Sequence, residues 1–214
     1  ASARRLFEAL GVWERVGSHA EAMREIIVTD AAPGAAARPA LLHFGEDTRP
    51  GQPSAHMVEN RHLNQALLDE VLASPAIRLA LGRPVTAFKF VPGLAEIILA
   101  DGAIHKAPLI AGADGRNSAA RRAAAIEMLG WDYGQAGIVA TAAHDLPHNG
   151  RAEEHFTPSG PFAILPLPGN RSSLVWTEPT SEAARIMALP EADFLEELRR
   201  RFGSHRGEVR LEGG

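Results

Sequence analysis

The residues best placed for chemistry lie in one stretch, residues 109–121. It begins as an apolar run, passes through Gly112-Ala113-Asp114-Gly115, and opens an alanine-rich helical segment. A strand that turns sharply into a helix presents backbone N–H groups to anionic ligands. Gly112 and Gly115 suit a corner that needs positive φ or close backbone approach, and the Asp114 carboxylate can accept hydrogen bonds from ligand hydroxyls. From these residues alone, a joint whose aspartate only caps the helix is the favoured interpretation.

The nine histidines do not form a recognisable metal motif. His144 and His148 are four residues apart, but Pro147 between them disfavours a shared helical face. His155 has no matching carboxylate at a recognisable spacing. We therefore predict no metal site and interpret the histidines as scattered surface residues.

Other familiar catalytic patterns are missing from the sequence. It contains neither G-x-S-x-G nor the phosphate-binding patterns G-x-G-x-x-G and G-x-x-x-x-G-K-[ST]. Ser159 lies in a predicted turn, and no residue is identified as a general base for it. Glu21, Glu25, Glu153 and Glu154 could pair as acid and base, but any acidic protein offers such pairs. The residues themselves therefore predict a corner that faces a ligand, but they do not identify a reaction.

Composition narrows the class of protein. Of the 214 residues, 45% are hydrophobic and 22% charged, as in ordinary globular proteins, and the net charge of −4 argues against nucleic-acid binding. No apolar run approaches the length of a membrane span. The absence of cysteine excludes disulfides, thiolate metal sites and cysteine nucleophiles.

The first half of the chain predicts helices joined to short strands. Apolar spacing predicts a helix over residues 2–10 and another over 59–73, with Asn60 as its N-cap. Strands are expected at 26–28 and 40–44, with loops at 31–39 and 45–53. A three-stranded meander is expected at 84–91, 95–100 and 103–111, turned by Pro92-Gly93 and Asp101-Gly102.

The second half predicts a sheet between two helices. The helix that opens after the Asp114 corner is expected to continue to Gly130. Strands at 138–141, 154–156, 161–167 and 172–177 indicate an antiparallel sheet with tight turns. Pro190 and Gly203 bracket a final helix. The fold class is mixed, α+β or α/β, with at least two sheets. The sheet that includes residues 161–167 is expected to form a separate layer or subdomain.

Several segments together resemble a known family. Residues 112–121 are similar to the G-A-D-G-x-x-S-x-x-R motif of class A FAD-dependent aromatic monooxygenases of the p-hydroxybenzoate hydroxylase type. Residues 2–13, 58–63, 160–168 and 173–177 resemble the ubiquinone-biosynthesis hydroxylase branch of that family. The match runs in order along nearly the whole chain.

The resemblance implies a fold and a set of contacts. The fold would be the central part of a p-hydroxybenzoate-hydroxylase-like fold, a partial FAD-binding domain plus an antiparallel substrate-binding sheet. The implied FAD contacts are Asp114, Gly115, Asn60, Arg61, Arg121 and His56. The implied substrate wall is Phe162, Ile164, Leu165 and Pro166, for which plain core packing is the alternative. The catalytic residue is left unknown.

The implied activity is hydroxylation of an aromatic ring through a flavin hydroperoxide, with NAD(P)H as reductant of FAD. The implied substrate is a phenol, a polyprenylated ubiquinone precursor. Two alternatives stay open: a flavin hydroxylase of a soluble aromatic substrate, and a non-catalytic module for binding or assembly. The resemblance implies a cytoplasmic location. It leaves open whether the protein contacts a membrane peripherally, whether it joins a biosynthetic complex, and which oligomeric state it has.

The resemblance also divides the chain. Residues 1–24 and 54–134 would belong to the partial FAD-binding domain with its meander, residues 25–53 and 135–189 to the substrate sheet, and residues 190–214 to a closing helix and strand. The family's G-x-G-x-x-G motif and its C-terminal G-D motif are not in the sequence. We therefore expect the chain to be the middle of a longer enzyme and to bind FAD poorly alone.

Overall fold

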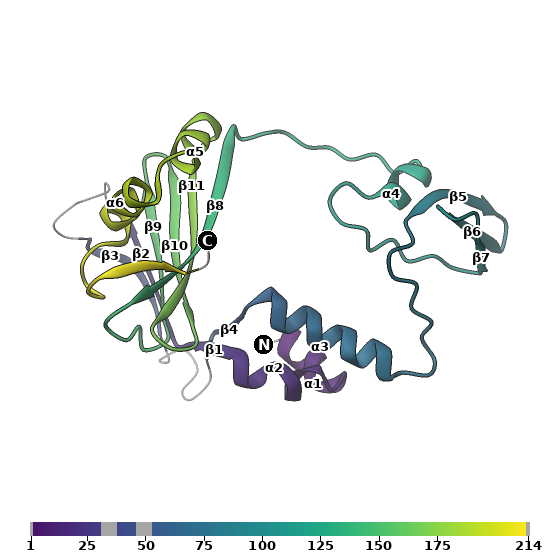
Figure 1. Cartoon of the computed structure of the whole chain (residues 1–214), viewed down its shortest axis with the longest axis horizontal. Coiled ribbons are helices and arrows are strands. Elements are labelled where there is room, and N and C mark those ends of the chain that lie inside the picture. Colours follow the sequence, from purple (N-terminus) through teal and green to yellow (C-terminus); the bar gives the residue numbers. More distant parts are fainter. Residues whose placement is uncertain (1, 31–37, 46–52, 213–214) are drawn as a thin grey trace. The chain divides into compact units, whose positions relative to one another are not determined.

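The computed structural model describes residues 2–30, 38–45 and 53–212 (Figure 1). Most of the two predicted loops, 31–39 and 45–53, lies outside the described residues. The chain forms two compact units, one of residues 1–73 with 133–214 and one of residues 74–132. We call them the larger and the smaller unit.

A mixed sheet dominates the larger unit. Its seven strands lie in the order β12-β8-β11-β10-β9-β2-β3. Their bounds are β2 Glu25–Asp30, β3 Ala40–Phe44, β8 Gln135–His144, β9 Arg151–Thr157, β10 Gly160–Leu167, β11 Arg171–Pro179 and β12 Val209–Glu212. Neighbours pair antiparallel, except that β2 and β9 run parallel. The predicted antiparallel sheet is confirmed, and so are the strands predicted at 26–28 and 40–44, which pair with each other.

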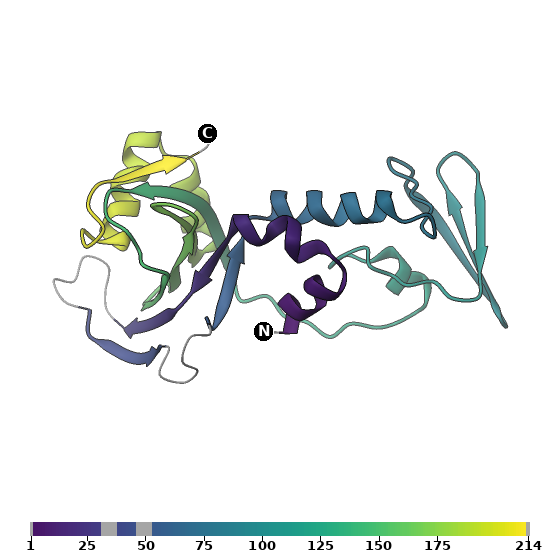
Figure 2. The same ribbon diagram turned by 90° about the horizontal axis from the view of Figure 1, so that it is seen from below.

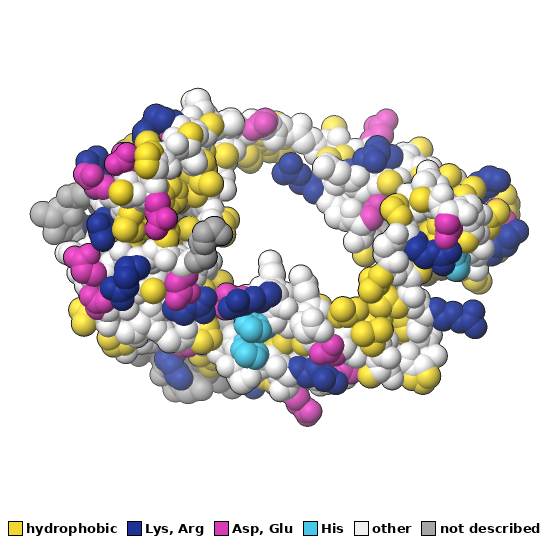
Figure 3. Space-filling model, in the orientation of Figure 1, with side chains coloured by type: hydrophobic (Ala, Val, Ile, Leu, Met, Phe, Trp, Pro, Cys, Tyr) yellow, Lys and Arg dark blue, Asp and Glu magenta, His cyan; other side chains and the backbone are white. Residues whose placement is uncertain are grey.

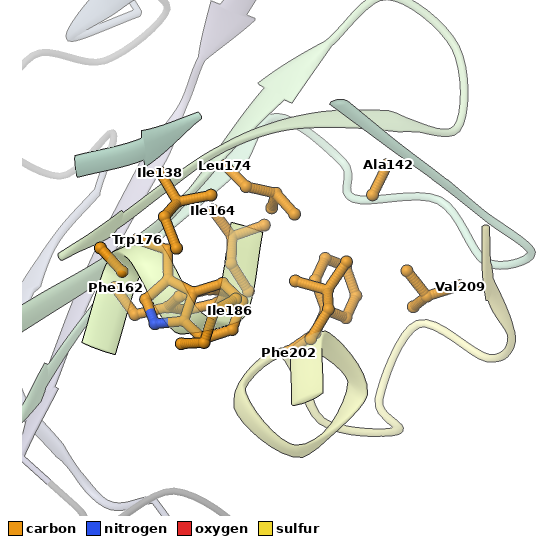
Figure 4. Close-up of a cluster of buried hydrophobic side chains, with 11 residues drawn as sticks. Ile138, Ala142, Phe162, Ile164, Leu174, Trp176, Ile186, Phe202 and Val209 are labelled. Carbon is orange, nitrogen blue, oxygen red and sulfur yellow. The ribbon is translucent and has the colours of Figure 1, made fainter. Parts of the chain in front are cut away.

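Two helices, α5 (Thr180–Met187) and α6 (Glu191–Phe202), cover one face of this sheet (Figure 1). The core between them is built from buried side chains of both layers (Figure 4): Ile138, Ala142, Phe162, Ile164, Leu174, Trp176, Ala183, Ile186, Leu198, Phe202 and Val209. Helix α6 confirms the predicted final helix, and Gly203 ends it at φ 85°. Helix α5 was not predicted.

The rest of the larger unit is a helical layer with a short strand pair. It contains α1 Ser2–Ala9, α2 Val12–Val16, the 3-10 turn η1 Gly17–His19, β1 Ala20–Met23, β4 Ala55–Val58 and α3 Asn60–Ala73. Strands β1 and β4 pair antiparallel, and β4 leads directly into α3 (Figure 2). Both predicted helices are confirmed. The predicted cap is wrong by one residue, because the Glu59 carbonyl accepts the first helical hydrogen bonds and Asn60 is already helical.

The smaller unit contains the predicted meander. Strands β5 (Val85–Val91), β6 (Leu94–Leu99) and β7 (Ile104–Ala107) pair antiparallel in that order. Gly93 and Gly102 turn the hairpins at φ 75° and 84°. These turns confirm the hairpin predictions.

Two predicted extensions in this unit are wrong. Strand β7 ends at Ala107 instead of reaching residue 111, and α4 is a single short helix, Ala119–Ala123, instead of continuing to Gly130. A strand needs a neighbour for its ladder and a helix needs a surface for its apolar face. Leu109 and Leu129 are 81% and 95% exposed, so neither segment has such packing within the described residues.

Basic and acidic side chains are interspersed on the face of the larger unit seen in Figure 3. Several charged side chains of this unit form ion pairs within a helix, such as Arg200 with Glu196 and Arg4 with Glu8. Among the described helices, none is long and apolar enough to cross a membrane.

Candidate functional site

The Asp114 corner is held together by the aspartate itself. Its Oδ1 accepts a hydrogen bond from Ser118 Oγ at 2.5 Å, and its Oδ2 accepts from the backbone N–H groups of Ala119 and Ala120 at 2.6 and 3.1 Å. The Ser118 hydroxyl and then the backbone donors lower the pKa of Asp114 to about 2. Asp114 is therefore an ionised cap of α4. The Asp114 side chain is exposed, so its carboxylate stays accessible to a ligand.

Neighbouring residues fix the same corner. Ser118 Oγ accepts from the Arg121 N–H at 2.9 Å, and the Arg121 guanidinium donates to the Arg116 carbonyl at 3.0 Å. A Cβ on Gly112 would lie 2.9 Å from the Ala120 Cβ, whereas Gly115 has φ 82° and open space around its Cβ position. Gly112 thus permits close packing against α4, and Gly115 leaves the corner accessible to a ligand.

The other predicted FAD contacts lie in the larger unit, at the junction of β4 and α3. His56 in β4 packs edge-on against Trp13, with ring centroids 5.1 Å apart. Burial, followed by the charge of Arg4, lowers the pKa of His56. Asn60 and Arg61 occupy the exposed first turn of α3. The structure therefore gathers the six predicted contacts into two groups, one in each unit.

An ion-pair cluster that the sequence did not reveal anchors that first turn. The Arg171 guanidinium of β11 donates to both carboxylate oxygens of Glu59, at 3.2 and 3.3 Å, and to Glu212 at 2.5 Å. The hydrogen bond from Arg171 holds the pKa of Glu59 below its usual value. The start of α3 is thereby tied to the sheet. No local spacing signals this contact, because 112 residues separate its partners.

The predicted substrate wall divides between the two faces of β10. Phe162 and Ile164 are 1% and 0% exposed, and both point into the core beneath α5 and α6 (Figure 4). Pro166 shares that face by strand alternation. Leu165 points to the opposite face and is half-buried. Of the four predicted residues, only Leu165 therefore lies on the face that these helices leave open.

The histidines differ from their prediction. His144, His148 and His155 are 2%, 8% and 5% exposed, so the interpretation as scattered surface residues is wrong for these three. Contacts between segments distant in sequence bury them beside polar partners. His144 contacts the Ser172 hydroxyl at 3.0 Å, and His155 contacts that of Thr29 at 2.7 Å. The described part of the chain contains no group of three or more residues arranged to hold a metal.

A buried carboxylate organises the interior beside β9. Glu153 lies 2.6 Å from the Arg206 guanidinium and 3.0 Å from His205, and an ion-pair distance of 3.2 Å separates it from His155. Glu153 and His155 line a pocket of about 660 Å³ on the helix-covered side of the sheet. None of the predicted cofactor or substrate residues lines this pocket.

This cluster predicts a pH dependence of folding. Burial opposes ionisation of Glu153, but the nearby His155 ring, the hydrogen bond with His205 and the charge of Arg206 outweigh it, and its pKa lies well below 4.5. An acid whose pKa is lowered by folding stabilises the fold above its unfolded pKa. We expect this stabilisation to decline as the pH falls below about 4.5 toward the folded pKa.

Urea unfolding of the wild type and of Glu153→Gln at pH 7, 5, 4 and 3 measures this dependence. The free energy difference between the two proteins should shrink toward low pH. A difference that stays constant from pH 7 to pH 3 would contradict the expectation.

The sequence is similar to curated hydroxylases along almost its whole length. It is 42% identical over 209 residues to ubiquinone hydroxylase UbiL of Rhodospirillum rubrum, covering 98% of this chain and 47% of that protein. It is 31% identical over 211 residues to the human mitochondrial ubiquinone biosynthesis monooxygenase COQ6, covering 93% and 43%. The chain spans about half the length of the curated relatives it matches. No family model matches it.

Solved structures share the fold. PqsL of Pseudomonas aeruginosa, described as a probable FAD-dependent monooxygenase, superposes with a TM-score of 0.75 at 19% identity, over 98% of this chain and 60% of that one. The flavin-dependent monooxygenase PieE, solved with FAD and substrate, gives 0.70 at 16% identity, over 98% and 40%. The predicted fold class and the predicted resemblance are confirmed.

Proposed function

We propose that the protein carrying this sequence is a FAD-dependent monooxygenase that hydroxylates an aromatic ring. The reason is that the chain resembles ubiquinone-biosynthesis hydroxylases over almost its whole length. The single observation that carries the proposal is the 42% identity to a ubiquinone hydroxylase over 209 residues. The fold of the chain, shared with PqsL and PieE, supports it.

The Asp114 corner fits FAD. Gly115 leaves open space at the turn, and the ionised Asp114 carboxylate is exposed to a ligand. We propose Asp114, Gly115 and Arg121 as FAD contacts, and separately His56, Asn60 and Arg61. Bound FAD would take electrons from NAD(P)H and supply the oxygen chemistry.

The chain's own residues contribute positioning. Arg121 and Ser118 hold the corner in its folded form before any ligand arrives. Arg171 fixes the first turn of α3 through Glu59. Such preformed contacts lower the cost of ordering the protein when a ligand binds.

The substrate class that we propose is a phenol of the ubiquinone pathway, which the names of UbiL and COQ6 support. A polyprenylated phenol partitions into lipid, so the proposal includes a peripheral contact with a membrane or a biosynthetic complex at its surface. The division of the chain into FAD-binding and substrate-binding segments at residues 24, 53, 134 and 189 is likewise part of this proposal.

The test is made on the full-length protein. FAD uptake is titrated by flavin fluorescence, and products from prenylated and unprenylated phenols are identified by mass spectrometry with NAD(P)H present. A gain of one oxygen on the prenylated ring supports the proposal. Hydroxylation of the unprenylated phenol alone would indicate that the substrate is a soluble aromatic compound. Absence of FAD uptake would contradict the proposal that the protein is a flavin-dependent hydroxylase.

Asp114→Asn in the full-length protein is expected to weaken FAD binding by about tenfold or more, because it removes the charge that orders the corner. Asp101→Asn is the matched control. Asp101 is also a hydrogen-bonded carboxylate of the smaller unit, bound by Arg83 and by the Ala103 N–H. Equal FAD binding by the two variants would show that Asp114 serves only as a helix cap.

A further inference from the structure

Glu154 is a lone carboxylate in an apolar row across the open face of the sheet. Residues that pair directly on neighbouring strands point to the same face. The register aligns one residue from each of six strands in a single row: Leu42, Val28, Glu154, Ala163, Val175 and Val139. Five members of this row are aliphatic, and only Glu154 can form hydrogen bonds through its side chain.

This row lies on the face opposite to α5 and α6. Phe162 of β10 and Trp176 of β11 stand next to the row members Ala163 and Val175 along their strands, and both pack into the core beneath those helices. Adjacent residues of a strand face opposite sides, so the row faces away from the helices. In contrast, Val139 is 71% exposed, Leu42 is 55% exposed and Val175 is 37% exposed. The outer members of the row are therefore accessible, whereas Ala163, which pairs with Glu154, is 7% exposed.

Glu154 differs sharply from its neighbour Glu153. Glu153 is buried on the helix side and is surrounded by His155, His205 and Arg206. Glu154 is half-buried, and its carboxylate has no hydrogen bond or ion pair within the described residues. Burial raises the pKa of Glu154. A partly desolvated carboxylate without a donor is costly, so a ligand that supplies one gains binding free energy.

An apolar surface with one strong acceptor is complementary to an apolar molecule with one polar hydrogen. We propose that Glu154 accepts a hydrogen bond from the hydroxyl group of the aromatic substrate, while Val139, Val175 and Leu42 contact its apolar part. This inference rests on the proposed function for the identity of the ligand. It assigns the recognition of the hydroxyl group to Glu154, and it makes the open face of the sheet the binding surface.

The test uses the full-length protein and a pair of probes, 4-nonylphenol and its methyl ether, 4-nonylanisole. The two differ in the hydrogen that Glu154 would bind. A hydrogen bond to a charged group contributes enough to give a preference of about tenfold or more for the phenol. Dissociation constants are measured by equilibrium dialysis for the wild type, Glu154→Leu, Glu154→Gln and Glu196→Gln.

We expect the wild type and Glu196→Gln, a control on the outer surface of α6, to prefer the phenol. Glu154→Leu should bind both probes with affinities within about threefold, because it keeps the apolar surface and lacks the acceptor. Glu154→Gln keeps the size of the side chain and should show an intermediate preference for the phenol. It keeps the test valid if the leucine variant does not fold.

Two results would overturn the inference: a wild type that binds both probes equally, or a phenol preference that survives in both Glu154 variants. FAD content is measured on the same samples. Failure of the wild type to take up FAD would reject the proposed function, whereas loss of the phenol preference in the Glu154 variants would still support the binding surface.

Discussion

Arg206→Leu is expected to lower the free energy of unfolding of the larger unit by about 3–5 kcal/mol, because it strands a buried carboxylate. Arg206 is 3% exposed and donates to Glu153 Oε1 at 2.6 Å. It also donates to the Ser172 hydroxyl at 3.0 Å and to the Arg151 carbonyl at 3.2 Å. Urea denaturation followed by tryptophan fluorescence measures the loss.

The matched control is Arg185→Leu. Arg185 makes an equally short ion pair with Glu182, at 2.6 Å, but both side chains are exposed. Removing an exposed pair should change stability little. If the two variants lose the same stability, the Arg206 contact does not have the role that its burial indicates.

The double variant Glu153→Leu with Arg206→Leu separates two explanations of the loss. If the stranded charge causes it, removing both partners should restore much of the stability, since apolar residues often replace a buried ion pair without loss. If packing causes it, the double variant should be less stable than either single variant. We expect the restoration to be incomplete, because His205 also loses its partner.

The elements that could be predicted from the sequence are those specified by local pattern. Helix α6 has an acidic first turn, a basic last turn and a glycine after it. The hairpin at Asp101-Gly102 needs only its own turn chemistry. Residues 109–111 and 124–130 carry equally apolar patterns, yet they form no strand or helix, because such patterns need a partner surface that the described residues do not provide.

The candidate site likewise combines contacts that a local pattern specifies with contacts that depend on residues distant in sequence. The bonds that fold the Asp114 corner span four to six residues, so a motif of the sequence could indicate them. The role that we propose for Glu154 depends on pairing between β2 and β9, whose residues are more than a hundred positions apart. The sequence showed Glu154 as one acid among several. Only the strand register separates it from Glu153, because adjacent residues of a strand face opposite sides.

Trp176→Ala should therefore act mainly on stability and Val175→Ala mainly on ligand binding, although the two residues are adjacent on β11. Trp176 is 2% exposed, its indole N–H donates to Glu178 at 2.7 Å, and the Arg201 guanidinium lies 4.2 Å from its ring centroid. Truncating a buried tryptophan costs about 3–5 kcal/mol. Glu178 and Arg201 would also lose a shared neighbour, which places the expected cost at the upper end of that range.

Val175 is 37% exposed on the opposite face, where the proposed ligand would lie. Its truncation should cost less than about 1 kcal/mol of stability, because little apolar area returns to water. It should nevertheless weaken binding of 4-nonylphenol, whereas Trp176→Ala should affect binding only through loss of folded protein. Urea denaturation and equilibrium dialysis on both variants give the comparison. A Val175 variant that destabilises as strongly as Trp176→Ala would mean that this face of the sheet is packed within the protein, and the binding surface centred on Glu154 would then have to be abandoned.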